Sequence, residues 1–496
     1  MSVAAYFARL WVRATEAGPA RRALAEDFWP RYRGRLVRAT GYDDEDQVIQ
    51  VLSDFHATQA AEGWELSATL AVMKAIDEQF SAIHPRIHLM PTSAARPALP
   101  DWLLGAEADR VYSGAYWRDA DRRVIAKGPL SRGMALPEAT DTLSDRFSAL
   151  TVVSGAFEHD TRAVPISMRV LTPHATTGIR LTGTPGAERV AFAPIAEAGV
   201  DLEPSVHTLA AGRFLDVRPA STLRGGQRLL DAARAVGPVD ILVAPELVMS
   251  DADFIEFQNG LTSSAGSNPL LTLAGSGLTA ANSAEGLSWN EARMVNPAGA
   301  VLWRQKKLSP YAMKANTAFD LGLVTDSVGG PLVEYVANGE DLTIVDTDGL
   351  GRCLILICQD FQSDPIVANV IKAYQPDWVF VPIMDTGVGP TRWPQIRTNS
   401  LSSTSQARYL VVSSLAMCHW NATCVSPPPV GLAVGPAVPS PDGNGDLLDA
   451  KRVAKSATLP TTGGGPRVVT IRWRDHDWDQ VSIAVVSGAG APPAGR

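Results

Sequence analysis

Cysteine is scarce in this chain, and its few copies are not arranged in a recognisable pattern. Four cysteines in 496 residues, at positions 353, 358, 418 and 424, are too few for a disulfide scaffold. They also lack the paired C-x-x-C spacing of a structural metal site. We therefore expect a cytoplasmic protein with reduced thiols, without a metal and without a cofactor.

Long apolar runs and charge of one sign are lacking as well. No stretch approaches the ~20 apolar residues that span a bilayer. The first apolar stretch contains Arg9 and Arg13, which does not match a secretory signal peptide. The formal net charge is −8, from 44 basic and 52 acidic residues, so no basic surface for nucleic acid is indicated. We expect neither a membrane nor a nucleic-acid partner.

Hydrophobic residues, by contrast, are plentiful. They make up 46% of the chain against 19% charged residues, which is the balance of a folded globular protein. A length of 496 residues exceeds one ordinary domain. The expected division is a mainly helical N-terminal domain over 1–146, a β-rich connecting segment over 147–185, an α/β domain over 186–487 and a flexible tail over 488–496. The N-terminal domain has no evident role; binding of a protein partner, oligomerisation and covering of an active site are the alternatives.

The hydrophobic period changes along the chain and indicates where helices give way to strands. Apolar residues at three- and four-residue spacing predict three helices, over 28–41, 44–63 and 65–83. Alternation predicts strands at 148–157, 163–171 and 178–183. From Arg189 onward, apolar strands alternate with helices, which is typical of an α/β sheet. The Pro- and Gly-rich stretch 425–445 is expected to be a loop.

Three reactive side chains follow predicted strands of this α/β region. DILVAPE ends in Glu246, GAVLWRQKK ends in Lys307 and LILIC ends in Cys358. Functional groups collect at strand ends in such folds. Because a helix is expected soon after Cys358, the thiol would lie in a sharp strand-to-helix turn, with the backbone N–H of Gln359 directed at the reacting carbon.

The three residue types together suit attack on an amide. A thiol is mostly protonated at neutral pH, and the thiolate is the nucleophile. Glu246 would take the proton of Cys358 and later give it to the departing amine. Lys307 and a backbone N–H would stabilise the oxyanion. The product would be an amine and a thioester, which water then hydrolyses.

The order PEL, RQKKL and ICQD resembles the Glu–Lys–Cys triad of the nitrilase (carbon–nitrogen hydrolase) superfamily. Further segments resemble that family in the same order, namely RVAFAPIAEAGVD, VNPAGAVLWRQKK, DWVFVPIMD, QARYLVVSSLA and PSPDGNG. The resemblance implies Glu246 as base, Lys307 as cation and Cys358 as nucleophile, with Glu334 as a second glutamate near them. It also implies a nitrilase-like αββα sandwich for the C-terminal domain, and a homodimer or higher homo-oligomer.

Each site residue also has a simpler interpretation. Cys358 taken alone is a small core residue, Glu246 a helix cap, and Glu334 a solvated loop acid. Lys306 competes with Lys307 as the cation. Asp385, at the end of DWVFVPIMD, is either a turn-stabilising residue or a contact for a cationic substrate group.

The leading hypothesis for function is an amidase-type hydrolase of a small amide or modified metabolite. An N-acyltransferase of the same chemistry and a non-catalytic, nitrilase-like binding module are the alternatives.

Overall fold

The computed structural model describes most of the chain, with gaps. The described residues are 1–17, 28–83, 99–128, 143–171, 188–347, 350–389, 391–402, 405, 407–420, 429–435, 453–458, 467–474 and 477–485. Within these residues no helix is both long and apolar enough to cross a bilayer. The expected domain boundary near residue 185, the predicted strand 178–183 and the expected tail 488–496 all lie outside the described residues.

The described chain is α/β, as expected, and divides into two compact units. Unit 1 comprises Met1–Thr172 together with two later segments, Ile344–Arg352 and Ala368–Asp377. Unit 2 comprises Pro173–Thr343, Cys353–Val367 and Trp378–Arg496. Cys358 therefore lies in a part of unit 2 that two segments of unit 1 flank in the sequence.

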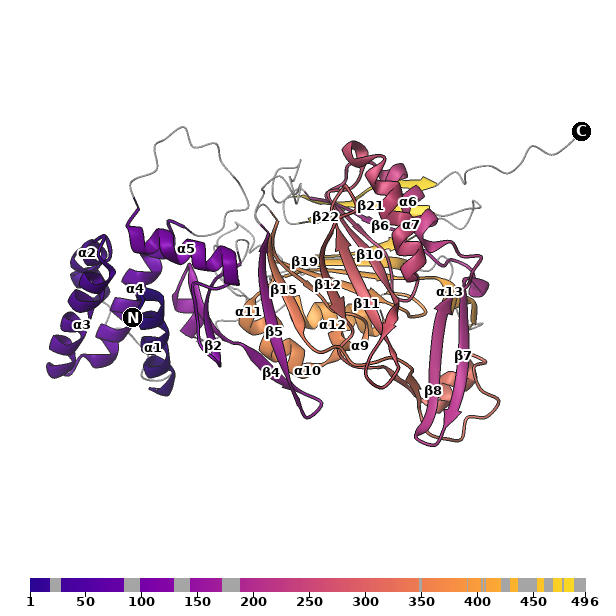
Figure 1. Ribbon diagram of the computed structural model, residues 1–496, viewed down its shortest axis with the longest axis horizontal. Helices are drawn as coiled ribbons and strands as arrows, with labels where there is room; N and C mark the ends of the chain where they lie inside the picture. The colour runs from indigo at the N-terminus through magenta and orange to yellow at the C-terminus, as the bar shows by residue number, and fades with distance from the viewer. Residues whose placement is uncertain are drawn as a thin grey trace, which may run out of the picture. The chain divides into compact units, whose positions relative to one another are not determined.

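Unit 1 begins with helices, and the three predicted ones are confirmed. Its helices are α1 (Val3–Glu16), α2 (Phe28–Thr40), α3 (Glu45–Ala61), α4 (Glu65–Phe80) and α5 (Asp101–Ser113) (Figure 1). Their apolar faces share one core that includes Phe7, Leu52 and Phe80. Helical spacing puts such residues on one side of each helix, so burying them together stabilises the unit.

Strands complete unit 1. A sheet of three strands has the order β1 (Trp117–Arg118), β2 (Arg122–Ala126) and β3 (Leu150–Ser154). The buried carboxylate of Asp77, on α4, accepts 2.8 Å hydrogen bonds from the N–H groups of Ser148, Ala149 and Leu150 and so ties the helices to β3. β4 (Ala156–His159) and β5 (Arg162–Leu171) form the following hairpin. The strand predicted at 163–171 is thus confirmed, whereas the one predicted at 148–157 is divided at Gly155 into β3 and β4, which belong to different sheets.

Unit 2 contains two larger sheets. The first has the strand order β12-β11-β10-β9-β6-β21-β22. The second contributes β20-β19-β18-β17-β16. Their bounds are β6 (Arg189–Phe192), β9 (Ile241–Val243), β10 (Leu271–Asn282), β11 (Ser288–Val295), β12 (Val301–Lys306), β16 (Gly351–Ile355), β17 (Trp378–Ile383), β18 (Arg408–Ser413), β19 (Pro429–Gly435), β20 (Val453–Thr458), β21 (Arg467–Arg474) and β22 (Asp477–Val485). β16, β17 and β18 pair in parallel, as do β6, β9 and β10.

These two sheets face each other, and helices cover their outer sides. β10 contacts β17, and a Cβ on Gly431 of β19 would come within 2.5 Å of the Phe192 ring on β6. Helices α6 (Gly225–Val236) and α7 (Asp251–Thr262) contact the first sheet, and α12 (Trp393–Ser402) contacts the second (Figure 1). Unit 2 therefore has αββα layering.

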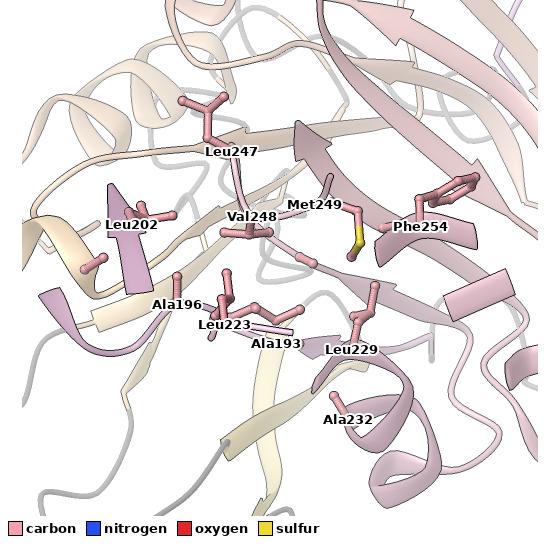
Figure 2. Close-up of a cluster of buried hydrophobic side chains, with 14 of the residues drawn as sticks. Ala193, Ala196, Leu202, Leu223, Leu229, Ala232, Leu247, Val248, Met249 and Phe254 are labelled. Atoms are coloured by element: carbon pink, nitrogen blue, oxygen red, sulfur yellow. The ribbon is translucent and has the colours of Figure 1, made fainter. Parts of the chain in front are cut away.

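The segment after β9 is anchored in an apolar cluster of unit 2. Val248 and Met249 are buried in this cluster with Leu223, from the turn before α6, and Leu229 of α6, whereas the Leu247 side chain points to the other side of the segment (Figure 2). Val248 and Met249 also donate backbone hydrogen bonds to Ser276 O on β10, at 3.0 and 3.2 Å. Glu246 immediately precedes this segment, so its backbone is held by the core on its C-terminal side.

The loop predicted over 425–445 is wrong in its described part, because Pro429–Gly435 forms β19. Its proline lies at the first residue of the strand, where proline is tolerated. Gly431 lies against the Phe192 ring, where no side chain would fit. The proline and glycine that suggested a loop are thus what this crowded strand requires.

A smaller, four-stranded sheet of unit 2 had no counterpart in the sequence prediction. Its order is β13 (Ala312–Met313), β14 (Leu332–Glu334), β8 (Gly212–Pro219) and β7 (Leu202–Leu209). Two of these strands have only two or three residues, and β14 pairs with β8 from more than a hundred residues earlier in the chain. Short runs of this kind give no reliable period.

The expectation of reduced thiols does not hold throughout. Cys353 and Cys358 are buried and form no disulfide, but Cys418 is disulfide-bonded. Its partner lies outside the described residues. A count of cysteines could not reveal this bond, because it carries no information on which sulfurs lie close together.

Candidate functional site

Cys358 lies in a sharp turn between a strand and a helix. β16 ends at Ile355, and α9 (Gln359–Gln362) begins directly after Cys358. The cysteine has φ +47° and ψ −102°, a conformation that costs a non-glycine residue energy and is typical of nucleophile elbows. Its side chain is 8% exposed and lines a cavity.

Glu246 follows β9 and is fixed on both sides. Leu247, the next residue, also has a positive φ, +57°. The Glu246 N–H donates to Ile383 O at 3.4 Å, and the Met384 N–H donates to Glu246 Oε2 at 2.9 Å. The backbone at the end of β17 therefore holds both the main chain and the carboxylate of Glu246.

The same end of β17 also holds the cysteine. The Cys358 N–H donates to Pro382 O at 3.0 Å. Glu246 comes from the first sheet and Cys358 from the second, so the strand end at 382–384 connects the two. The Cys358 thiol and the Glu246 carboxylate line the same cavity, and the carboxylate charge acts on the thiol.

Lys307 directly follows the last residue of β12 and is fully enclosed. Its Nζ lies 2.8 Å from Glu246 Oε1 and also donates to Glu334 Oε2. Its neighbour Lys306 takes the opposite direction, with Nζ 3.4 Å from the centre of the Trp289 ring. Alternation along a strand explains why only one of the two lysines reaches the carboxylates.

Glu334 and Asn290 complete the buried polar cluster. Glu334, on β14, is 9% exposed and accepts the Tyr311 N–H at 3.1 Å. Asn290, on β11, is fully buried, and its Nδ2 donates to Glu246 Oε1 at 2.9 Å and to Glu334 Oε1 at 3.2 Å. Asn290 was missed by the sequence analysis. An asparagine inside a strand is unusual, and that was the available signal.

Burial and charge set the protonation of the cluster. Burial, and then the charges of Glu246 and Glu334, raise the pKa of the Cys358 thiol well above its usual range, although Lys307 opposes this. Burial also raises the pKa of Glu246, against Lys307 and together with Glu334. Burial works against the Lys307 charge, but the two glutamates outweigh it and hold the pKa of Lys307 well above its usual range. At rest the thiol is protonated and the lysine is charged.

Asp360 and Gln359 occupy the helix that begins at the elbow. The buried carboxylate of Asp360 accepts hydrogen bonds from the Leu308 N–H at 3.0 and 3.1 Å and from the Ser309 N–H at 3.1 Å. Burial raises the pKa of Asp360 to about 7. Asp360 thus connects the cysteine turn to the residues just after Lys307. Gln359 is the first residue of α9, and its side chain is not among the described residues that line the cavity.

Asp385 lines the cavity beyond the cysteine. Its carboxylate pairs with Arg392 at 3.0 Å and accepts hydrogen bonds from Trp393 Nε1 at 2.5 Å and from the Thr386 N–H at 2.5 Å. These bonds fit the turn-stabilising interpretation. Its charge is also one of those that raise the pKa of Cys358.

The cavity has a volume of about 400 Å³. Glu246, Lys307, Glu334 and Cys358 all line it. The thiol, a base, a fixed cation and a space for a substrate are therefore present in one place, which is the arrangement that acyl transfer requires. Among the described residues, no group of three His, Cys, Asp or Glu side chains could hold a metal ion.

Comparisons with known proteins give a likeness of structure alone. No family model matches the sequence, and no curated protein is similar to it. The chain is similar to Nit3 of Saccharomyces cerevisiae, a member of branch 10 of the nitrilase superfamily, at 12% identity and a TM-score of 0.35, with 58% of this chain and 90% of that chain covered.

Two further structures are similar to a comparable degree. A cysteine-to-alanine mutant of the nitrilase-superfamily amidase from Nesterenkonia AN1 has 14% identity and a TM-score of 0.35, over 60% of this chain and 94% of that one. The glutamine-dependent NAD⁺ synthetase from Acinetobacter baumannii has 14% identity and a TM-score of 0.33, over 62% and 48%. With scores of this size, a function for this chain rests on its own residues.

Proposed function

We propose that the chain is an amidase-type carbon–nitrogen hydrolase of the nitrilase superfamily, with Cys358 as nucleophile, Glu246 as general base and Lys307 as stabilising cation. The observation that carries the proposal is the thiol of Cys358 at a strained strand-to-helix turn, open to a cavity that the Glu246–Lys307 pair also lines. Strain is retained at a turn where the surrounding structure enforces it, and functional sites are where it collects.

Acylation begins with proton transfer. The raised pKa of Cys358 means that the thiol keeps its proton until a base removes it, and Glu246 lines the same cavity as the thiol. The sulfur then bonds to the amide carbon, and the carbonyl π electrons move to oxygen. When the tetrahedral intermediate collapses, the C–N bond breaks. The nitrogen takes the proton from Glu246 and leaves as ammonia or an amine.

Deacylation repeats these steps with water. Glu246, ionised again, takes a proton from water, whose oxygen attacks the thioester carbon. The C–S bond breaks, the carboxylic acid leaves and the sulfur regains the proton. Lys307 keeps its charge throughout, because the two glutamates hold its pKa high. A fixed charge in a buried site stabilises the oxyanion of both steps without reorganisation.

Glu334 and Asn290 act as positioning residues. Glu334, on β14, accepts a hydrogen bond from Lys307. The side-chain amide of Asn290, on β11, donates to the carboxylates of both Glu246 and Glu334. Two carboxylates and one ammonium leave one excess negative charge, which keeps Glu246 basic enough to take a proton. The cluster is thus organised around Glu246.

The proposal is tested by ammonia release from a panel of simple amides and nitriles. We expect wild-type turnover of amides and a loss of at least a thousandfold in Cys358→Ala, with an unchanged melting temperature. Iodoacetamide should label Cys358, which lines the cavity, and not Cys353, which is fully buried in β16. Equal turnover by wild type and Cys358→Ala would overturn the proposal.

A further inference from the structure

The small sheet of unit 2 forms one wall of the active-site cavity. Leu215 and Val217 of β8 line the cavity, and so does Leu332 of β14. Their neighbours Phe214 and Val333 line a different cavity instead. Successive residues of a strand point to opposite faces, so one face of this sheet presents aliphatic side chains to the space in front of Cys358.

Other elements add apolar side chains to the lining. They are Leu247 from the segment after Glu246, Leu321 from the turn after α8 (Ala315–Asp320), Met384 and Met417. Methionine side chains are flexible and adapt to ligands of varied shape. The lining therefore offers an aliphatic group an apolar surface, beside polar side chains that include Tyr311, Thr317, Gln362 and Thr391.

Each described cation that lines the cavity is already paired with a carboxylate. Lys307 is bonded to Glu246 and Glu334, and Arg392 is bonded to Asp385. Three carboxylates against two cations leave the lining with an excess of negative charge. A carboxylate on a substrate would have to be buried without a cation of its own, which is costly.

From these two observations we infer that the cavity takes the acyl group of an uncharged, aliphatic amide. The inference deepens the proposed function and rests on it. The aliphatic chain lies against Leu215, Val217 and Leu332, and the carbonyl carbon lies at the Cys358 sulfur. A volume of about 400 Å³ is at the small end of the ~300–1,000 Å³ of small-molecule pockets. It admits an acyl chain of a metabolite and not a folded peptide.

Chain length is the first test. Each methylene buried against an apolar wall contributes roughly a fourfold gain in binding. We expect kcat/KM to rise from acetamide through butanamide to hexanamide, by on the order of 100-fold in all. A kcat/KM that is flat or falls with chain length would overturn the inference and leave the amidase proposal standing.

Charge is the second test, at matched length. Hexanamide is compared with the monoamide of glutarate, which carries a terminal carboxylate, and with 5-aminopentanamide, which carries an ammonium. We expect at least a tenfold preference for hexanamide over both. A preference for the anion would show that Arg392 binds the substrate, and a preference for the cation would show that Asp385 does; either result overturns the inference.

A matched pair of variants tests whether the small sheet causes the preference for longer amides. Leu215→Phe adds bulk to the cavity wall, and Leu209→Phe makes the same change at an exposed position on β7 of the same sheet. We expect Leu215→Phe to lower kcat/KM for hexanamide at least tenfold while acetamide changes less than threefold. Leu209→Phe should match the wild type for both. Equal losses for both amides in Leu215→Phe would contradict the binding role.

Binding to Cys358→Ala separates this inference from the proposed function. If no amide is hydrolysed by the wild type, the proposed function fails. Calorimetry with Cys358→Ala still measures which amide the cavity accepts. Tighter binding of hexanamide than of glutarate monoamide supports the inference, and equal or reversed affinities overturn it.

Discussion

At the scale of the residue, strand ends were the useful signal. Glu246, Lys307 and Cys358 each follow an apolar run in the sequence, and the structure brings all three together around one cavity. Glu334 joins them from a three-residue strand, where the sequence left its interpretation open. Asn290 was not predicted, because its role depends on the pairing of β11 with β12 and on two carboxylates far away in the sequence.

The two adjacent lysines give a sharp test at this scale. Lys307→Met keeps the length of the side chain but removes the charge between two buried glutamates. We expect kcat to fall at least a hundredfold, as when one oxyanion contact is lost. Lys306→Met removes only a contact with the Trp289 ring, worth about 0.5–1 kcal/mol, and should leave turnover within threefold. Steady-state kinetics of both variants test this assignment. A loss of turnover in Lys306→Met would mean that Lys306, and not Lys307, is the stabilising cation.

The pH dependence of turnover gives a second test. Glu246 acts as base only when ionised, and burial raises its pKa. The acid limb of the kcat/KM profile should therefore lie above the ~4.3 of an ordinary glutamate. Activity is lost as the pH falls through that raised value. Lys307 should add no alkaline limb near neutrality, because its pKa is raised as well.

Glu334→Gln is the matched variant for this profile. The Glu334 charge is one of the causes that raise the pKa of Glu246. Removing that charge should move the acid limb to lower pH, whatever happens to the maximal rate. An acid limb that moves to higher pH would contradict the assignment of Glu246 as the titrating base.

At the scale of the element, helices and fully apolar strands could be predicted, and the small sheet could not. The helices α2, α3 and α4 show a helical period, and β17 and β18 are continuous apolar runs that are buried throughout. In the sheet β13-β14-β8-β7, which forms a wall of the cavity, β13 and β14 have only two and three residues, and β14 pairs with β8 from more than a hundred residues earlier. β7 and β8 have eight residues each, but their burial does not alternate regularly, so the sequence showed no clear strand pattern there.

Asp360 tests how elements are held together. It joins α9, next to Cys358, to the end of β12, next to Lys307. Asp360→Ala removes the carboxylate that accepts hydrogen bonds from the N–H groups of Leu308 and Ser309, and the loss of a buried hydrogen bond costs about 1–3 kcal/mol. We expect the free energy of unfolding to fall by roughly 2–4 kcal/mol and kcat to fall with it, because Lys307 loses its fixed position.

The conservative variant Asp360→Asn controls for the loss of the acceptor. Its amide oxygen retains one of the two acceptor atoms, so both effects should be intermediate. Denaturant unfolding and kcat are measured on the same preparations. If Asp360→Ala loses stability but keeps full kcat, Asp360 does not position Lys307.

At the scale of the whole molecule, the two units interleave in the sequence. Ile344–Arg352 and Ala368–Asp377 belong to unit 1, although they lie on either side of the Cys358 segment. Within unit 1 the fully buried Arg352 pairs with Asp346 at 2.7 Å and donates to Ala126 O at 2.5 Å. Tyr374 Oη donates to Ser154 O at 2.5 Å. Sequence periodicity could not show this, because each of these bonds except the one to Asp346 spans some 220 residues.

A shortened chain of residues 186–496 tests this interleaving. It lacks Ala126 and Ser154, so the Arg352 guanidinium and the Tyr374 hydroxyl lose acceptors that the full chain supplies. Buried polar groups without partners cost about 1–3 kcal/mol each, and more when charged. The strand that carries Arg352 leads within six residues to Cys358.

We therefore expect the shortened chain to be poorly soluble or inactive. Coexpression of residues 1–185 as a separate chain should restore both solubility and iodoacetamide labelling of Cys358. A shortened chain that is soluble and fully active alone would show that unit 1 contributes nothing to the geometry at Cys358.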